Sequence, residues 1–576
     1  MRQVEERAFA AHDGVSLFFR YWPGTQPKAI VLLHRGHEHS GRMVHVAEDL
    51  NLPDFSVFAW DARAHGRSQG DQGSTTTMGT FAQDLDEFVR HIHSEYDIPV
   101  ENIAIVAQSI GAVVAAAWVH DYAPAIRCLV LAAPAFQVKL YVPFARLGLG
   151  LWHTIAGDFF VNSYVKASAL THDPERIASY TTDPLIKRLI SARVLLGLYE
   201  TAARIVEDAA AIRVPTQLLL SGSDWVVSNK PSLTFLSRLD TPDKETHTFS
   251  GFFHDILGEK DRHLPIARAR AFIEAQFVKP RQRPSLAKAD QSGFTKSEFD
   301  TLNTPLPVWS PKHWSFALTR LFMRTIGRSS DGIRLGLNTG FDSGSSLDYV
   351  YRNQASGWTP LGKLIDWCYL NSIGWRGIRI RKQSLEALIA QAIALLAQSR
   401  RPLRIVDVAA GHGRYVLDAI TKNGAQPEDI LLWDLQPDNV SSGRCLAAKS
   451  GLKVRFILAD AFKSGAIAAL TPKPTLGIVS GFFELFPDNA PLHRTLSGLA
   501  SAIERGGYLI YTGQPWHPQI ERIARTLNNH QGEDNWVMRR RTQEELDELI
   551  HSAGFRKVAQ RMDPMGLFTV SLAERI

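Results

Sequence analysis

The sequence predicts an α/β protein of two domains, and three observations lead to this prediction. The chain has 576 residues, which is too long for one ordinary domain. In both halves, apolar stretches of the kind found in buried strands alternate with helical stretches, as is typical of a largely parallel sheet covered by helices. Between the halves, residues 279–293 gather proline and polar residues without a hydrophobic period, as a linker does.

Composition narrows the class of protein. Apolar residues make up 45% of the chain and charged residues 21%, and the formal net charge of +6 is spread along the sequence. Stripes of basic and aromatic residues do not exceed those of a globular surface, so we expect no nucleic-acid partner. The cysteines Cys128, Cys368 and Cys445 are too few for a disulfide framework and too dispersed for a metal cluster, which indicates a reducing compartment. The charged N-terminus lacks an apolar leader, so we expect a cytoplasmic protein or, alternatively, one attached peripherally to the inner face of a membrane.

The first organising stretch is residues 103–112. Four β-prone apolar residues lead to Ser109, and a long alanine-rich helical stretch follows. This order of strand, sharp turn and helix is that of a nucleophile elbow, in which small residues are needed two positions before and after the serine. Ala107 and Gly111 meet that need. By itself, the pattern fits an ordinary buried strand-to-helix turn equally well.

Two predicted strands upstream, residues 30–33 and 55–60, each end in a polar loop. The first loop reads His-Arg-Gly-His-Glu-His-Ser-Gly-Arg over residues 34–42, and the second reads Asp-Ala-Arg-Ala-His-Gly-Arg-Ser over residues 61–68. Loops at the carboxyl ends of parallel strands carry the chemistry of such sheets. Together with the serine turn, these motifs resemble the α/β-hydrolase family, in particular its monoacylglycerol lipase and lysophospholipase branch. The resemblance implies an N-terminal α/β-hydrolase fold over residues 1–278, with a helical cap at about 134–212.

An acid and a base follow the serine in the order that this fold uses. A predicted strand at residues 216–224 delivers Asp224 at its end, and His254 lies in a loop that opens a helix. The resemblance implies that His254 accepts the Ser109 proton, while Asp224 fixes the imidazole tautomer. The neighbouring Asp255 is the rival acid, and we expect it to cap the following helix instead.

The resemblance also assigns the loop after the first strand. The backbone N–H groups of Gly36 and Ile110 are expected to form the oxyanion hole, although Arg35 stands where the family usually has glycine. Four histidines of the two loops resemble a metal cluster by count, yet the family explains them as residues that structure the loops, so we predict no metal site. These histidines are His34, His37, His39 and His65.

The predicted cap begins with an apolar run at residues 136–152. Pro143 and several glycines break this run, so it is not a membrane span. It could line an acyl-chain pocket, dip into a bilayer surface or be buried under the rest of the cap. Together with the family resemblance, the apolar cap predicts a lipid-like ester as the substrate and peripheral membrane contact as an option.

The second organising stretch is residues 403–417, where a strand passes through a glycine-rich turn into a helix. Such a turn lets the backbone approach a ligand at a helix N-terminus. Two later predicted strands, residues 430–434 and 454–460, each end in an acid suited to grip ribose hydroxyls or an adenine amino group. This pattern resembles the class I S-adenosylmethionine-dependent methyltransferase family, with its Rossmann-like fold, over residues 361–576. The positions that match its cofactor motifs are Asp407, Ala409 (in place of glycine), Gly411, Gly413, Asp434 and Asp460.

Several features of the second half stay open. Residues 279–360 are expected to form a linker and an irregular segment. A nicotinamide-binding Rossmann domain is the rival for residues 361–576, and the third acid disfavours it. No Asn-Pro-Pro-Tyr-like tetrapeptide follows the fourth strand, where Glu484 could be a base, a substrate contact or a structural acid. Basic residues at 376–382 could hold a phosphate or carboxylate, or form a solvated helix start.

The sequence therefore predicts a bifunctional enzyme, a serine ester hydrolase fused to an S-adenosylmethionine-dependent methyltransferase. The alternative is a serine hydrolase whose C-terminal domain binds S-adenosylmethionine without catalysis or acts as a scaffold. A third hypothesis has both sites inactive and the protein serving as a membrane-associated interaction platform.

Overall fold

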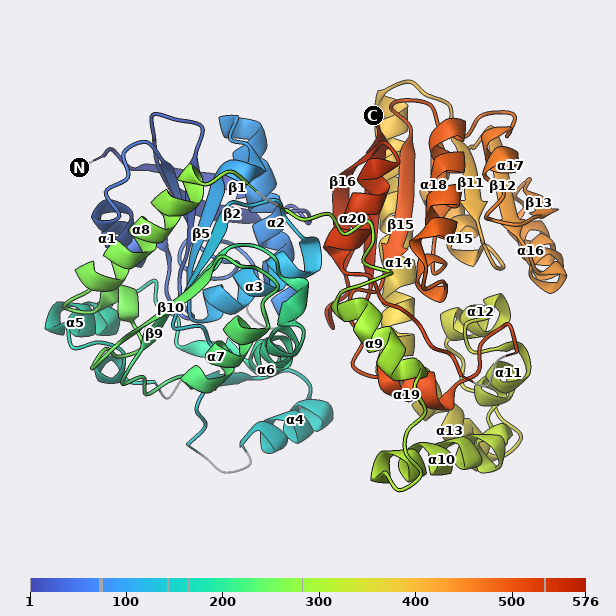
Figure 1. The fold of residues 1–576 in the computed structure, drawn as a ribbon, viewed down its shortest axis with the longest axis horizontal. Helices are drawn as coiled ribbons and strands as arrows, with labels where there is room; N and C mark the ends of the chain where they lie inside the picture. The colour runs from blue at the N-terminus through green and yellow to red at the C-terminus, as the bar shows by residue number, and fades with distance from the viewer. Residues whose placement is uncertain (1, 72–75, 142–144, 163–164, 282, 533–534) are drawn as a thin grey trace. The chain divides into compact units, whose positions relative to one another are not determined.

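Two separate β-sheets organise the chain, one in each of two units, Met1–Arg283 and Pro284–Ile576 (Figure 1). The computed structural model describes residues 2–71, 76–141, 145–162, 165–281, 283–532 and 535–576. Each sheet is covered by helices and has its own apolar core. The predicted α/β class is therefore confirmed for both halves.

The first unit contains an eight-stranded sheet with the strand order β1-β2-β4-β3-β5-β6-β9-β10. Strand β2 is antiparallel to both of its neighbours, and all pairs from β4 to β10 are parallel. The strands are β1 (Glu5–Ala10), β2 (Ser16–Trp22), β3 (Ala29–Leu33), β4 (Ser56–Trp60), β5 (Ile103–Gln108), β6 (Cys128–Ala132), β9 (Thr216–Ser221) and β10 (Lys244–Phe249).

Helices cover both faces of this sheet (Figure 1). Helices α1 (Val44–Asp49) and α8 (His263–Val278) share one core cluster with strand residues such as Leu32 and Val106. Helices α2 (Met78–Tyr96) and α3 (Ile110–Tyr122) lie on the opposite side. Because the central strands are buried on both faces, their sequences are nearly continuous apolar runs.

The predicted helical cap lies between β6 and β9. Its described elements are α4 (Ala145–Ala156), β7 (Phe160–Asn162), α5 (Pro174–Thr182), β8 (Leu189–Ser191) and α6 (Ala192–Glu207). Over the stretches of chain that the structure describes, every helix is too short or too polar to cross a membrane.

The second unit contains a seven-stranded sheet with the strand order β13-β12-β11-β14-β15-β17-β16. Strand β17 is antiparallel to both of its neighbours, and the other pairs are parallel. The order reverses between β11 and β14, and ligands bind at such a switch point in open α/β sheets. The strands are β11 (Arg404–Val408), β12 (Asp429–Asp434), β13 (Arg455–Leu458), β14 (Leu476–Val479), β15 (Tyr508–Gly513), β16 (Phe555–Met562) and β17 (Thr569–Arg575).

Helices from different parts of the chain cover the two faces of this second sheet. One face packs against α14 (Ile373–Gln398), α15 (Arg414–Asn423) and α16 (Pro437–Ser450). The other packs against α17 (Ser464–Ala468), α18 (Asn489–Ala502) and α20 (Gln543–Ser552).

The prediction of an irregular segment over residues 279–360 is wrong for most of its length. Four helices lie there, and together with α13 and α19 (Ile520–Thr526) they gather at one end of the second sheet (Figure 1). These helices were hard to predict because each has only a few turns and breaks at glycine or proline. They are α9 (Phe294–Asn303), α10 (Pro311–Arg324), α11 (Asp331–Thr339) and α12 (Gly344–Arg352), followed by α13 (Pro360–Leu370). Helices α10, α11, α12 and α13 are stabilised by packing in a core cluster of their own, and α9 packs against α19.

Candidate active sites

Ser109 occupies the turn between β5 and α3, with φ +54° and ψ −115°. A positive φ is strained for a serine, and strain of this kind concentrates at functional sites. The turn is so tight that a Cβ added to Gly111 would lie 2.5 Å from the His34 carbonyl oxygen. Ala107, at the end of β5, is fully buried. The structure thus shows why both flanking positions hold small residues.

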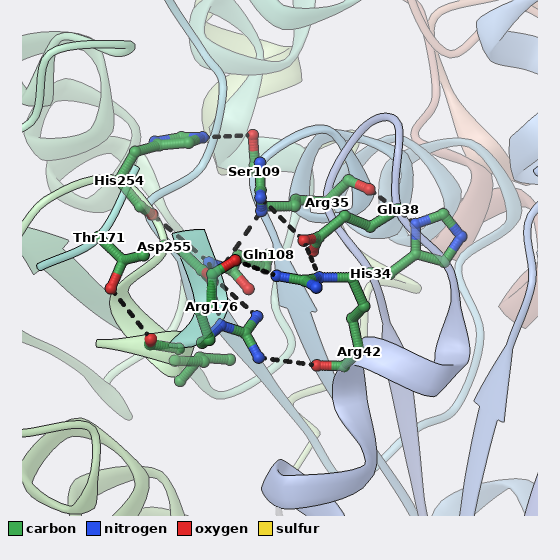
Figure 2. Close-up of polar contacts among 12 residues, drawn as sticks. His34, Arg35, Glu38, Arg42, Gln108, Ser109, Thr171, Arg176, His254 and Asp255 are labelled. Atoms are coloured by element: carbon green, nitrogen blue, oxygen red, sulfur yellow. Dashed lines mark hydrogen bonds and ion pairs between the residues drawn. The ribbon is translucent and has the colours of Figure 1, made fainter. Parts of the chain in front are cut away.

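Three predicted side chains form a continuous hydrogen-bonded chain. His254 Nε2 lies 2.8 Å from Ser109 Oγ (Figure 2). On the other side of the ring, His254 Nδ1 lies 2.8 Å from Asp224 Oδ2. With Nδ1–H donating to the carboxylate, Nε2 is the nitrogen that can accept the serine proton. Burial acts to raise the pKa of Asp224, but His254 and the N–H groups of Val227 and Val226 outweigh it and lower this pKa. The acid is therefore held as a carboxylate beside the imidazole.

Asp255 does not cap the following helix, which corrects the expectation from the sequence. Its carboxylate lies 2.8 Å from Arg176 Nη2 and 4.0 Å from Arg35 Nε, and it accepts a hydrogen bond from Gln108 Nε2 (Figure 2). Burial acts to raise the pKa of Asp255, but the two guanidinium groups outweigh it and hold this pKa well below the ordinary value. Asp255 is thus occupied by arginines, while Asp224 alone of the two acids reaches His254.

Arg35 explains how the first loop accommodates a large residue in place of glycine. Its guanidinium is buried, donates to Glu38 at 2.8 Å and lies over the ring of Tyr180 from α5. Glu38 also accepts from Arg42 at 2.5 Å. This buried network joins the loop after β3 to the cap.

The loop and the turn enclose the predicted oxyanion position. A cavity of about 660 Å³, here called the serine cavity, is lined by Gly36, Ser109, Ile110 and His254. The backbone N–H groups of Gly36 and Ile110 form no hydrogen bond with any residue that the structure describes. The rest of the wall is almost entirely apolar, with residues such as Leu140, Leu149, Leu170, Leu198 and Val226.

The apolar run at residues 136–152 has more than one environment. Leu140 and Leu149 line the serine cavity, Phe136 is buried, and Leu151 and Trp152 are exposed. Residues 142–144, which include Pro143, lie outside the described residues. The run therefore contributes both to the cavity wall and to the surface of the cap.

The four loop histidines contact different partners. His34 bonds the Arg35 carbonyl and the Ala62 N–H, and His37 bonds the Lys187 carbonyl. His39 pairs with Asp183 at 2.9 Å, and His65 bonds the Arg63 carbonyl. Within the described ranges, no group of three or more histidine, cysteine or acidic side chains is arranged to hold a metal ion.

In the second unit, the turn after β11 has the backbone conformation of a ligand-binding loop. Ala409, Gly411 and Gly413 all have positive φ, at +61°, +59° and +70°. A Cβ added to Gly413 would lie 2.3 Å from Leu432 Cδ1, so helix α15 and strand β12 approach each other closely there. A cavity of about 390 Å³, here called the turn cavity, lies against this turn at the switch point of the sheet.

Two of the three predicted acids line the turn cavity. Asp434 Oδ2 accepts from the Gly411 N–H at 2.8 Å, and its Oδ1 accepts from Gln436 and Asn439. Asp460 follows β13, and its Oδ1 accepts from the Phe462 N–H. These bonds fix the direction of each carboxylate and leave lone pairs that can accept from hydroxyl or amino groups.

Asp407 departs from the predicted placement. It is fully buried within β11, is not part of the wall of the turn cavity among the described residues, and accepts from Tyr415 Oη at 2.6 Å. Burial raises its pKa well above the ordinary value, with a further contribution from Asp434. The strand alternation places this side chain beneath the turn, so a role in holding the turn fits its position better than ligand contact.

Sequence reasoning missed part of this wall. Asp348 of α12 lines the turn cavity and pairs with Arg414 at 2.6 Å, but its helix lies in the segment predicted as irregular. Phe462, Phe482 and Phe486 also line it, with ring centroids 4.7–5.2 Å apart. Their place after β13 and β14 was a signal, because loops at the carboxyl ends of strands form such sites.

Of the basic residues at 376–382, only Arg381 lines a cavity among those described. Arg376 is exposed, and Arg379 donates to the Leu370 carbonyl. Lys382 pairs with Asp418 and Glu386. The interpretation as a solvated helix start therefore holds for Arg376, while Arg379 and Lys382 bond to neighbouring groups.

Two family models match the chain. The model described as "Serine aminopeptidase, S33" matches residues 25–261, and the model described as "Putative methyltransferase" matches residues 269–575. "Uncharacterized protein YnbC" of Escherichia coli (strain K12) is 50% identical over 576 residues, covering 99% of this chain and 98% of that protein.

The first unit has further relatives of its own. The monoacylglycerol lipase of Mycolicibacterium smegmatis is 26% identical over 279 residues, covering 46% of this chain and 96% of the lipase. The crystal structure of Paleococcus ferrophilus monoacylglycerol lipase is 21% identical and covers 45% of this chain and 99% of that chain, with a TM-score of 0.42.

Proposed function

This chain belongs to the family described as "Putative methyltransferase", joined to an α/β-hydrolase domain, and from these two domains we propose a bifunctional enzyme. The first unit hydrolyses a lipid-like carboxylic ester. The second transfers a methyl group from S-adenosylmethionine. The observation that carries the proposal is the hydrogen-bonded chain of Ser109, His254 and Asp224 at the wall of a large apolar cavity.

The geometry accounts for each step of ester hydrolysis. His254 Nε2 takes the Ser109 proton as Oγ bonds the ester carbonyl carbon, and the N–H groups of Gly36 and Ile110 donate to the resulting oxyanion. The C–O bond then breaks, and His254 returns the proton to the leaving alcohol. Water, deprotonated by His254, releases the acid from Ser109 in the same way. Asp224 stabilises the imidazolium of His254 both when Ser109 is acylated and when the acid is released.

The class of substrate follows from the serine cavity. Its volume of about 660 Å³ and its apolar wall suit an acyl chain, and relatives of the first unit are named monoacylglycerol lipases. Helix α4 of the cap exposes Leu151, Trp152 and Ile155 to 65%, 59% and 70%. Such side chains support the proposal of peripheral membrane contact.

The residues that line the turn cavity support S-adenosylmethionine as its ligand. Gly411 and Gly413 keep the backbone close to the ligand, while Asp434 and Asp460 offer acceptors to ribose and amino groups. Ser480 Oγ, in the same wall, is buried without a partner among the described residues. When bound, this cofactor supplies an activated methyl group and leaves as a thioether. An S-adenosylmethionine-binding unit without catalysis is the alternative.

Two measurements on the full chain test the two activities separately. A fluorophosphonate should label the wild type and not Ser109→Ala, and hydrolysis of 1-monooleoylglycerol should be lost in that variant. Isothermal titration should show S-adenosylmethionine binding that Asp434→Ala weakens and Asp429→Ala, at the far end of the same strand, does not. Absence of labelling would refute the hydrolase, and absence of binding would refute the methyltransferase.

A further inference from the structure

A second cavity of the C-terminal unit, of about 530 Å³, has no role in the function proposed above. It adjoins the turn cavity, because Arg381, Gly481 and Leu485 line both. Most of its wall is apolar. The wall includes Phe322, Met323, Ile378, Leu527, Trp536 and Phe568, and we call it the apolar cavity.

The wall of the apolar cavity holds an ion pair and three polar atoms that are unpaired among the described residues, and one of these residues, Arg381, also lines the turn cavity. Arg381 Nη1 donates to Glu484 Oε1 at 3.3 Å, and both side chains are at least nine-tenths buried. Glu484 Oε2, Arg381 Nε and Gln514 Nε2 are buried and bond to no residue that the structure describes. Buried polar atoms are rarely left unpaired, so these atoms point to a ligand that both donates and accepts.

His517 adds a donor to the same wall. Its Nδ1 accepts from the Gln519 N–H at 3.0 Å, so the neutral ring carries its proton on Nε2. Burial lowers the pKa of His517 to about 4, and burial also raises the pKa of Glu484. The same wall therefore holds a neutral imidazole and a carboxyl group that binds protons more readily than usual.

We propose that the apolar cavity binds the methyl acceptor, and that the acceptor is a lipid-like alcohol whose hydroxyl donates a hydrogen bond to Glu484 Oε2. This inference rests on the methyltransferase function proposed above. A hydroxyl donates to the carboxylate while accepting from Arg381 Nε or Gln514 Nε2. A carboxylate cannot donate a hydrogen bond to Glu484 and is repelled by its negative charge. An ammonium group has no lone pair with which to accept a hydrogen bond from Arg381 Nε or Gln514 Nε2.

The chemistry of the transfer then balances. Glu484 Oε2 takes the hydroxyl proton, and the hydroxyl oxygen bonds the methyl carbon. The carbon–sulfur bond breaks with its electron pair left on sulfur, giving a methyl ether and a thioether. Hydrolysis of an ester whose alcohol part is a long chain is a class of reaction that supplies such an alcohol.

The test uses decan-1-ol, decanoate and decylamine with the full chain. Binding of 10-bromodecan-1-ol is followed by quenching of tryptophan fluorescence, because Trp375 and Trp536 line the apolar cavity. Thr319→Trp, which fills this cavity from α10, should abolish saturable quenching, and Ser315→Trp, one turn earlier on the same helix, should preserve it. Titration of S-adenosylmethionine should be unchanged in both variants.

Methyl transfer identifies the acceptor group. Decan-1-ol should yield decyl methyl ether, with little product from decanoate or decylamine. Glu484→Gln should keep alcohol binding and reduce kcat by about 10²-fold or more with little change in KM, since a general base contributes that much.

The outcomes separate the two proposals. S-adenosylmethionine binding without alcohol quenching overturns the acceptor assignment alone, as does preferred methylation of decanoate. Absence of S-adenosylmethionine binding overturns the methyltransferase function and the acceptor assignment with it.

A second inference rests on a different observation, an exposed apolar surface on α10 and α13. Both helices pack against the 3-10 turn η6 (Ile326–Ser329). Six of their large apolar side chains are more than half exposed, and exposed apolar side chains in this number are typical of an interaction surface. They are Trp314, Leu318, Leu321, Leu361, Leu364 and Trp367, which we call the α10/α13 face.

The segment that contains α10 and η6 carries basic side chains and no acidic ones, although Lys312 pairs with Glu521 of α19. Residues 301–330 contain no aspartate or glutamate, but they include Lys312, Arg320, Arg324 and Arg328. Tryptophan and leucine side chains flanked by cations are suited to the boundary of a bilayer with anionic head groups. Leu364 also lines the apolar cavity, so this cavity reaches the same surface.

From these features we infer that the α10/α13 face binds an anionic lipid bilayer. The test is co-sedimentation of the full chain with vesicles of phosphatidylcholine, alone or mixed with phosphatidylglycerol. Partition should be stronger with phosphatidylglycerol and should fall with added salt. Leu318→Ser should reduce partition by about tenfold, because the variant loses the favourable free energy of transferring one leucine side chain from water into the bilayer. Leu233→Ser on α7 (Asn229–Arg238), also an exposed helical leucine, should not.

Equal partition of Leu318→Ser and Leu233→Ser would overturn this inference, as would failure of the wild type to bind either vesicle. A monomer–dimer equilibrium that Leu318→Ser abolishes, without vesicle binding, would assign the face to a second copy of the chain instead.

Discussion

Replacement of Asp255 by asparagine tests the division of labour between the two neighbouring acids. Asp255 is 1% exposed and is the counter-charge for Arg176 at 2.8 Å and Arg35 at 4.0 Å. Asparagine keeps the shape but leaves these guanidinium groups short of one negative charge. Breaking a buried ion pair from one side costs about 3–5 kcal/mol, so the melting temperature of the first unit should fall by about 6–20 °C.

Asp224→Asn is the matched variant, because it makes the same change at the acid that is hydrogen-bonded to His254. Loss of this acid places the imidazole proton on the wrong nitrogen, and we expect kcat to fall by about 10⁴-fold. Its stability should change less, because the N–H groups of Val226 and Val227 can still donate to the remaining amide oxygen. Asp255→Asn, measured well below its melting temperature, should retain most of its turnover.

Calorimetry and 1-monooleoylglycerol hydrolysis, measured on both variants, decide the question. The pH dependence adds a check, because Asp255 has a lowered pKa in the folded state. Its contribution is complete above the unfolded pKa of about 3.9 and is lost as the pH falls below that value. The reasoning fails if Asp255→Asn abolishes turnover without loss of stability, or if Asp224→Asn remains active.

The second unit gives three further predictions. Asp434→Ala should weaken S-adenosylmethionine binding by about tenfold or more in isothermal titration, and unchanged affinity would remove this acid from the site. Gly413→Ala should lower the free energy of unfolding in urea by about 1–3 kcal/mol, because the new Cβ would clash with Leu432 and residue 413 has a positive φ. Gly424 also has a positive φ but has open space around it, so Gly424→Ala should lower this free energy less. Equal losses of unfolding free energy in the two variants would contradict this reasoning. The rate of methyl transfer to decan-1-ol should rise with pH as Glu484, whose pKa is raised by burial, loses its proton, and a pH profile that Glu484→Gln leaves unchanged would refute its role as base.

The sequence predicted the first unit well because its chemistry lies at fixed points of a regular fold. Ser109, Asp224 and His254 each follow a predictable strand or loop, and their order together with the family resemblance predicted that they would meet. The neighbour Asp255 was misjudged, since its partner Arg176 lies 79 positions away on the cap. A local rule for helix caps cannot detect such a contact.

The second unit shows a different limit. The acids after β12 and β13 were found from strand ends, but Asp348 was missed because short helices with their own core look irregular in sequence. Asp407 was expected at the ligand, and strand alternation turned it into the interior instead. The sequence left the role of Glu484 open, because it does not show that this residue lines an apolar cavity next to the turn cavity.

The arginine network beside Ser109 has a consequence for how substrate reaches the serine cavity. Arg176 and Tyr180 fasten α5 of the cap to Asp255 and Arg35. Lifting α5 away would strand these charges at a cost of about 3–5 kcal/mol, so such an opened form would make up less than about one molecule in a hundred. Helix α5 therefore stays in place when substrate enters, and any movement that opens the serine cavity involves another part of the cap.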